Sequence, residues 1–163
     1  MKNYQKTIRT TFYLLTSLLF FIGCISTEQN SESVKTDSTP PGVKAPAKYF
    51  TGNAYVEGMV DNDTIFTTQA GSVTFEPQAR SNWHSHPSGQ ILIVTEGVGY
   101  HQIKGQKKEI IRKGDVIKCP PNKIHWHGGS SDSSMTHIYI VPNTEKGIVN
   151  WMEAVTDEEF TSK

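Results

Sequence analysis

The sequence has few cysteines, no long apolar run and no surplus of basic residues, and each shortage excludes a class of protein. The 163 residues include only two cysteines, too few for a fold held together by several disulfides. No apolar run approaches the roughly 18 residues of a membrane-spanning helix. The 16 basic residues are matched by 16 acidic ones, so the charge balance does not indicate nucleic-acid binding. A chain of this length is expected to form one domain with its own hydrophobic core.

The first residues have the pattern of a bacterial export signal. Lys2, Lys6 and Arg9 precede a largely apolar segment, residues 12–22, whose 11 residues are typical of a signal-peptide core. The segment ends in FIGC, which resembles the lipobox of bacterial lipoproteins, although Phe21 stands where leucine is most usual. The resemblance implies cleavage after residue 23 and a lipid on Cys24. The protein would then be a periplasmic or outer-membrane lipoprotein that contacts the membrane through this anchor alone. The alternative is an ordinary secretory signal with an incidental cysteine.

Residues 24–47 are predicted to be a flexible tether to a domain that spans residues 48–163. The segment is rich in Ser, Thr, Glu, Lys and Pro, so it cannot bury enough apolar surface to offset the entropy of ordering. Without residues 1–23 the chain loses three bases and no acids, which leaves 13 basic and 16 acidic residues and a net charge of −3. Cys119 is then the one unmodified thiol, and we expect it to pack in the core.

Short apolar stretches separated by Gly, Pro, Asn and Asp predict an all-β domain. The expected strands cover residues 71–77, 90–97, 99–105, 109–115, 115–121 and 135–142. This spacing of short strands favours a sandwich or barrel, with a hairpin through Gly105. Thr156 and Glu159 form a capping-box pattern that predicts a short helix through Phe160. Trp151 and Phe160 are expected to pack this tail onto the barrel.

Four side chains form a candidate metal site. His84 and His86 in WHSHPSGQ are two residues apart, so on a strand both imidazoles face one side. Gln90 follows a Pro-Ser-Gly turn that would bring it beside them, and His125 lies 35 residues further on. Imidazole is the commonest ligand for divalent transition metals, and three imidazoles with one amide oxygen would leave two positions of an octahedral site open. The alternative is a set of surface histidines in a loop rich in Ser and Pro.

These residues resemble the two sequence motifs of the cupin superfamily. The first motif is matched by His84, His86, the Gln90 position and Gly97, and the second by Gly114, Pro120 and His125. The resemblance implies a single cupin barrel (a double-stranded β-helix, or jelly roll) and a homodimer. Four positions depart from the motifs: Gln78 and Asn122 replace glycine, Gly129 replaces asparagine, and Gln90 replaces glutamate. The change at Asn122 is mild, because asparagine tolerates positive φ.

Gln90 is the most informative of these departures. A glutamate ligand would cancel one unit of the metal's charge, whereas an amide cancels none. The site would therefore be a stronger Lewis acid that binds its metal less tightly. The alternative is a cupin that has lost its metal, although all three histidines remain.

A narrower resemblance covers WHSHPSGQ, LIVTEGVGY, KKEIIRKGDVI, PPNKIHWHG and MTHIYI. In order and spacing these phrases are similar to small single-domain cupins related to carboxymuconolactone decarboxylase. That group includes manganese-dependent bacterial hydroxynitrile lyases with a three-His, one-Gln site. The resemblance implies a small-molecule substrate and manganese as the metal, while iron, nickel, zinc and copper are also compatible with such ligands.

Two further histidines are candidate catalytic residues. In the resembling lyases the histidine at the place of His137 is the general base, a task that suits a neutral imidazole. The alternative is a hydrogen-bonded histidine without a catalytic role. His127 is expected to line the pocket or to support a ligand, and His101, which has no partner in the pattern, to face solvent. Trp83 and Trp126 are expected to pack the end of the barrel.

The pattern leaves four functions open. The first is an enzyme in which the metal polarises a substrate oxygen and His137 moves a proton, so that a cyanohydrin is split or a related acid is decarboxylated. The second is a metal-dependent dioxygenase. The third is a lipid-anchored cupin that binds a metal or a small ligand without turnover, and the fourth is a structural cupin without a metal.

Overall fold

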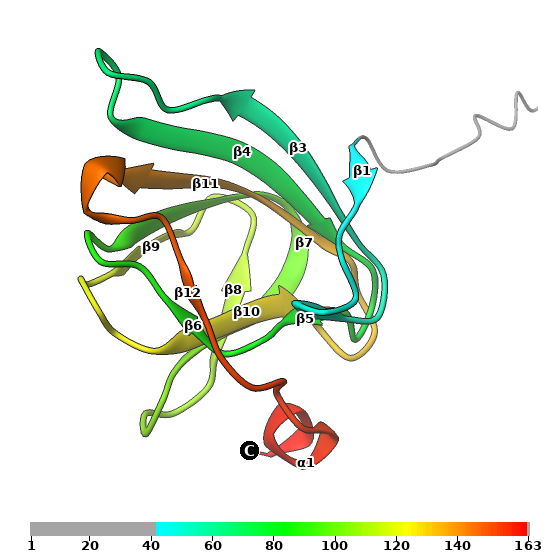
Figure 1. Ribbon diagram of the computed structural model, residues 1–163. Coiled ribbons are helices and arrows are strands. Elements are labelled where there is room, and N and C mark those ends of the chain that lie inside the picture. Colours follow the sequence, from blue (N-terminus) through cyan, green and yellow to red (C-terminus); the bar gives the residue numbers. More distant parts are fainter. Residues whose placement is uncertain (1–41, 163) are drawn as a thin grey trace, which may run out of the picture. The chain divides into compact units, whose positions relative to one another are not determined.

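The computed structural model describes residues 42–162, which form a curled antiparallel sheet closed into a barrel, with one short helix outside it (Figure 1). The strands are β1 (Val43–Lys44), β2 (Phe50–Thr51), β3 (Ala54–Val60), β4 (Thr68–Phe75), β5 (Arg80–Ser81), β6 (His84–Ser85), β7 (Gln90–Ile103), β8 (Glu109–Arg112), β9 (Val116–Cys119), β10 (His125–Gly129), β11 (Met135–Pro142) and β12 (Asn150–Trp151). The 3-10 helix η1 (Thr144–Lys146) and the helix α1 (Asp157–Thr161) complete the elements. The predicted signal peptide, Cys24 and most of the predicted tether lie outside the described residues.

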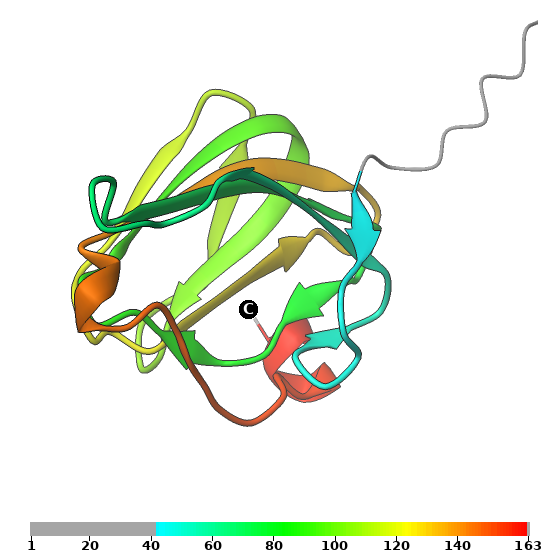
Figure 2. The ribbon, with the colours of Figure 1, turned by 45° about the horizontal axis from the view of Figure 1, so that its top comes forward.

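The sheet curls so that β3, β4 and β11 lie opposite β5, β6 and β10 (Figures 1 and 2). Its main path runs β1-β3-β4-β11-β7-β10-β5-β2, while β8 and β9 pair with β7, and β6 pairs with β10 and β12. Within residues 42–162 no helix is long and apolar enough to cross a membrane. The all-β barrel and the short C-terminal helix that the sequence predicts are both confirmed.

The long strand β7 turns the corner of the barrel. Its first half pairs with β11 and β9, and its second half pairs with β10 and β8. The turn lies at Gly97, where φ is 73° and a Cβ atom would stand 2.0 Å from the Ser134 carbonyl oxygen, so only glycine fits. The sequence predicts two strands here, residues 90–97 and 99–105. The structure joins them because the chain stays extended through the bend, where the register with β11 shifts between Thr136 and His137 and β7 passes from pairing with β11 to pairing with β10.

Other local predictions are confirmed. The hairpin of β7 and β8 turns through Gly105, and the capping box of α1 is complete, since Thr156 and Glu159 each donate a backbone N–H to the other's side chain. Gln78 and Asn122, which replace motif glycines, have φ of 68° and 60°. Both therefore adopt the left-handed conformation that a glycine would supply, and the two departures leave the backbone of the motifs intact.

The ordered domain begins before the predicted boundary at residue 48. Val43 and Lys44 pair with Val56 and Tyr55 of β3, and Ala45 is 8% exposed, so the end of the predicted tether belongs to the barrel. A two-residue strand has no periodicity of its own and is ordered only by its neighbour, so the sequence pattern does not reveal it. That neighbour, β3, is not among the predicted strands either, since four of its seven residues are exposed.

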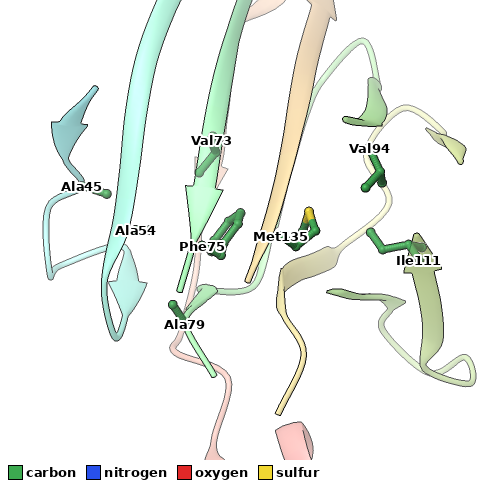
Figure 3. Packing of buried hydrophobic residues seen from close by; sticks show 8 residues of the cluster. All are labelled: Ala45, Ala54, Val73, Phe75, Ala79, Val94, Ile111 and Met135. Atoms are coloured by element: carbon green, nitrogen blue, oxygen red, sulfur yellow. The ribbon is translucent and has the colours of Figure 1, made fainter. Parts of the chain in front are cut away.

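Two groups of buried side chains stabilise the domain. The first lies inside the barrel and includes Phe75 and Met135, which are 0% exposed (Figure 3). The second consists of Trp83, Trp126, Val155 and Phe160 and packs α1 against the barrel. Because alternate residues of β10 point to opposite sides, Trp126 faces α1 while the histidines on either side of it face the interior. The predicted packing of Phe160, Trp83 and Trp126 is confirmed.

Candidate metal centre

All six histidines of the chain are buried in the barrel, none more than 5% exposed. Four of them line one cavity of about 220 Å³, together with Gln90: His84, His86, His127 and His137. The ring of His125 lies beside this set, with its centroid 4.3 Å from that of His84. The strands β6, β7, β10 and β11, with His86 directly after β6, bring the predicted site residues to one place, although they are spread over more than 50 positions of the sequence.

Three histidines are held in the same tautomer by backbone carbonyl groups. His84 Nδ1 lies 2.9 Å from the Asn82 oxygen, His86 Nδ1 lies 2.6 Å from the Ile148 oxygen, and His125 Nδ1 lies 2.9 Å from the Lys123 oxygen. A carbonyl oxygen only accepts, so each Nδ1 carries the proton and each Nε2 presents a lone pair. Metal-binding histidines are usually oriented by a second hydrogen bond of this kind.

The lone pairs of these Nε2 atoms lack ordinary partners. His86 Nε2 is buried and has no hydrogen-bond partner among residues 42–162. His125 Nε2 faces Gln90 Oε1 at 3.1 Å, and in the tautomer fixed by Lys123 these are two acceptors unless the amide is turned. A cation that accepts electron pairs from both atoms satisfies them together. The donor set therefore fits a divalent transition metal.

His127 and His137 form a second, directly hydrogen-bonded pair inside the cluster. His137 Nε2 lies 3.0 Å from His127 Nδ1, so one nitrogen donates and the other accepts. His127 also belongs to a group of possible ligand atoms in which one nitrogen each of His84, His125 and His127 lie within 4.8 Å of one another. This group contains His127, which the sequence analysis predicts to line the pocket rather than to bind the metal. His86 stands next to it, with its ring centroid 5.2 Å from that of His84.

The cluster is made of neutral imidazoles. Burial, with repulsion among the histidines, holds the pKa of His84 and His127 well below the ordinary value. Burial lowers the pKa of His125 to about 3 and that of His137 to about 4, and it also lowers that of His86. A histidine must be neutral to bind a metal, so the environment already provides the form that a ligand needs.

Aromatic side chains form one wall of the cavity. Trp151 stacks on Tyr49, with ring centroids 4.7 Å apart, and lies 4.9 Å from His84 and 5.6 Å from Phe50. Val73 and Val141 also line the cavity. Since a dry cavity of about 150 Å³ is enough for benzene, this one has room for a single substituted ring. Nothing in the sequence pattern indicates this wall, because its residues come from β2, β12 and the segments beside them.

Comparison with known proteins agrees with this architecture. Residues 71–141 match the family model described as cupin domain. The chain is 43% identical over 117 residues, 72% of its length and 89% of the relative's, to an (R)-mandelonitrile lyase of Granulicella tundricola.

The chain belongs to the cupin family.

Two solved structures of cupins are similar to this chain. A cupin-like protein from Thermotoga maritima is 44% identical, with a TM-score of 0.72, and the match covers 75% of this chain and 96% of that one. A cupin-2 domain from Rhodospirillum rubrum shares the fold at 14% identity, with a TM-score of 0.57 and coverage of 72% and 75%. The fold and the family that the sequence motifs imply are both confirmed.

The side chain of His101 is buried, contrary to the prediction from the sequence. It was expected to face solvent, but it is 2% exposed and its Nε2 lies 3.3 Å from Cys119 Sγ. The reason is the register of β7, in which His101 stands opposite His127 of β10 and so shares the inward face. Cys119 is buried as expected, and burial raises the pKa of its thiol to about 12. This pair does not line the cavity.

Proposed function

We propose that this cupin is a manganese-dependent lyase that splits a cyanohydrin into an aldehyde and cyanide. The observation that carries the proposal is the cavity itself, in which neutral histidines with free lone pairs meet an apolar, aromatic wall. The relative named (R)-mandelonitrile lyase supports the same class of reaction. The proposed metal ligands are His84, His86, Gln90 and His125.

The metal would supply a positive charge that stabilises negative charge on the substrate oxygen. The amide of Gln90 adds no negative charge, so the ligands do not weaken that effect. The Nδ1 bonds of the three histidines to backbone carbonyls hold their rings in place before any ligand binds. Preorganisation of this kind lowers the cost of charge development during the reaction.

His137 is the proposed general base, and His127 is its partner. In cyanohydrin cleavage the imidazole of His137 removes the hydroxyl proton while the carbon–oxygen double bond forms. The bond to the nitrile carbon breaks and leaves its electron pair on cyanide, which then takes a proton from the imidazolium. Because His137 and His127 share a hydrogen bond at 3.0 Å, the pair holds this proton between the two steps.

The cavity wall favours a substrate with an aromatic ring. The stacked pair of Tyr49 and Trp151 offers a flat apolar surface beside His84, and aromatic rings gain from offset or edge contacts with such a surface. A ring that packs there would place its substituent carbon next to the histidines.

The test is whether protein loaded with manganese cleaves mandelonitrile. The reaction is monitored through the absorbance of the benzaldehyde that it releases. His137→Ala is expected to lower kcat by about 10²- to 10⁴-fold without loss of the metal. His84→Ala is expected to lose both metal and activity. As a matched control, His101→Asn removes a buried histidine outside the cavity and is expected to keep the metal and most of the activity.

Two results would contradict the proposal. One is cleavage by the loaded protein at no more than the spontaneous rate, which together with metal and aldehyde binding would indicate a binding cupin without turnover. The other is a His137→Ala protein that cleaves mandelonitrile as fast as the wild type.

A further inference from the structure

One side of the cavity carries two polar groups that the proposed reaction does not use. Tyr139 follows His137 by two residues on β11 and lies on the same inward face. Gln69 of β4 pairs with Val141, two residues further along β11, and so lies diagonally across from Tyr139. Both side chains line the cavity. Neither makes a side-chain hydrogen bond to any of residues 42–162, although both are partly buried.

Gly71 determines where the Tyr139 ring lies. The two residues are directly opposite in the pairing of β4 and β11. A Cβ atom on Gly71 would stand 2.6 Å from Tyr139 Oη and 2.7 Å from its Cε1 atom, so the phenol ring lies flat across the bare backbone of β4. Any side chain at position 71 would push the ring away. The absence of one leaves the room that the Tyr139 ring and hydroxyl occupy on the wall.

The hydroxyl is suited to bind a polar group of a ligand. Burial, with Asp61 nearby, raises the pKa of Tyr139, so the group keeps its proton at neutral pH and is able to donate or accept. The wall next to it is formed by the apolar side chains of Val56, Val73 and Val141. Specificity in such pockets comes from a few fixed polar groups in an apolar lining, and a site built to bond a hydroxyl rejects the analogue that lacks it.

We propose that Tyr139, with Gln69 beside it, is a specificity determinant for substrates whose ring carries a second hydrogen-bonding group, remote from the carbon that reacts at the histidines. The chemical class is a hydroxyl-substituted aryl aldehyde or its cyanohydrin. The assignment of the reacting end rests on the proposed function, whereas the recognition of the ring substituent depends only on the cavity wall.

The experiment is calorimetric titration of the manganese-loaded protein with benzaldehyde, 3-hydroxybenzaldehyde and 4-hydroxybenzaldehyde. The wild type is expected to bind at least one of the two hydroxyl-bearing aldehydes about fivefold more tightly than benzaldehyde, as one net hydrogen bond predicts. Tyr139→Phe keeps the ring over Gly71 and removes only the hydroxyl, so this preference is expected to fall below twofold. Tyr100→Phe removes a hydroxyl on the outer surface, where it contacts Ser131, and is expected to keep the preference.

Three results would overturn the inference: equal affinity of the wild type for all three aldehydes, no binding of any of them, or a preference that persists in Tyr139→Phe. Cleavage of mandelonitrile, which has no ring hydroxyl, is measured on the same samples. That reaction does not need Tyr139, so the lyase proposal fails if the wild type does not cleave mandelonitrile. The specificity inference fails if the affinity ratio of hydroxybenzaldehyde to benzaldehyde is the same in the wild type and in Tyr139→Phe.

Discussion

Replacing Gln90 by glutamate should make the stability of the protein depend on the proposed metal. Gln90 is 6% exposed, its Oε1 lies 3.1 Å from His125 Nε2, and the described residues that line the cavity include no Lys or Arg. In the metal-free protein a glutamate here is therefore a buried carboxyl without a cation. Burial of this kind raises a carboxyl pKa by about one to three units, which corresponds to about 1.4 to 4 kcal/mol of lost stability at neutral pH.

The expected loss is large enough to measure by thermal unfolding. For a domain of this size about 1 kcal/mol shifts Tm by about 4 °C, so Gln90→Glu should lower Tm by about 6 to 16 °C in EDTA. In excess manganese the carboxylate gains a cation as its partner, and the loss should disappear or reverse. Circular dichroism melts of both proteins in both buffers measure the four values of Tm that are required.

Gln69→Glu is the matched control, because it places the same carboxyl in the same cavity on the wall away from the histidines. Its effect on Tm should be the same with and without manganese. The reasoning is refuted if Gln90→Glu lowers Tm equally in EDTA and in manganese, since Gln90 would then not face a bound cation.

Three other predictions follow from burial. Phe75→Ala removes a ring that is 0% exposed, with its centroid 5.7 Å from that of His127 and 5.8 Å from that of His137. It should lower the free energy of unfolding in urea by about 3 to 5 kcal/mol. A loss below about 1 kcal/mol would contradict the packing. Cys119, whose pKa burial raises to about 12, should react with iodoacetamide at pH 8 only after unfolding, and rapid labelling of the folded protein would show that the thiol is accessible. In metal-free protein the folded-state pKa values of His125 and His137, about 3 and about 4, lie below the ordinary 6.5, so the unfolded state binds more protons as pH falls. The free energy of unfolding should therefore drop from about pH 6.5 towards pH 4, by about 1.4 kcal/mol per pH unit for each histidine. A free energy of unfolding that does not change between pH 6.5 and pH 5 would be incompatible with neutral buried rings.

Much of the barrel is predictable from local patterns. The strand predicted over residues 135–142 coincides with β11, because β-branched and aromatic residues alternate there between a turn and a proline. The capping box of Thr156 and Glu159 predicted α1. Both signals are carried by neighbouring residues, so no knowledge of distant contacts is needed to read them.

Other features depend on partners that are remote in the sequence. The buried position of His101 follows from the bend of β7 and its register with β10, and the order of residues 43–45 follows from pairing with β3. The aromatic wall joins Tyr49 to Trp151 across about a hundred residues. For the same reason the cluster that contains His127 becomes visible only once β6 and β10 are paired at His84 and His125.

The most direct test of the account is the metal content of the protein, purified without chelator and without added metal. The comparison is with a double variant, His84→Ala with His125→Ala, checked for folding by circular dichroism. The account predicts close to one manganese per chain in the wild type and none in the folded double variant. A wild type that holds no divalent metal, and takes up none on titration with manganese, would contradict it.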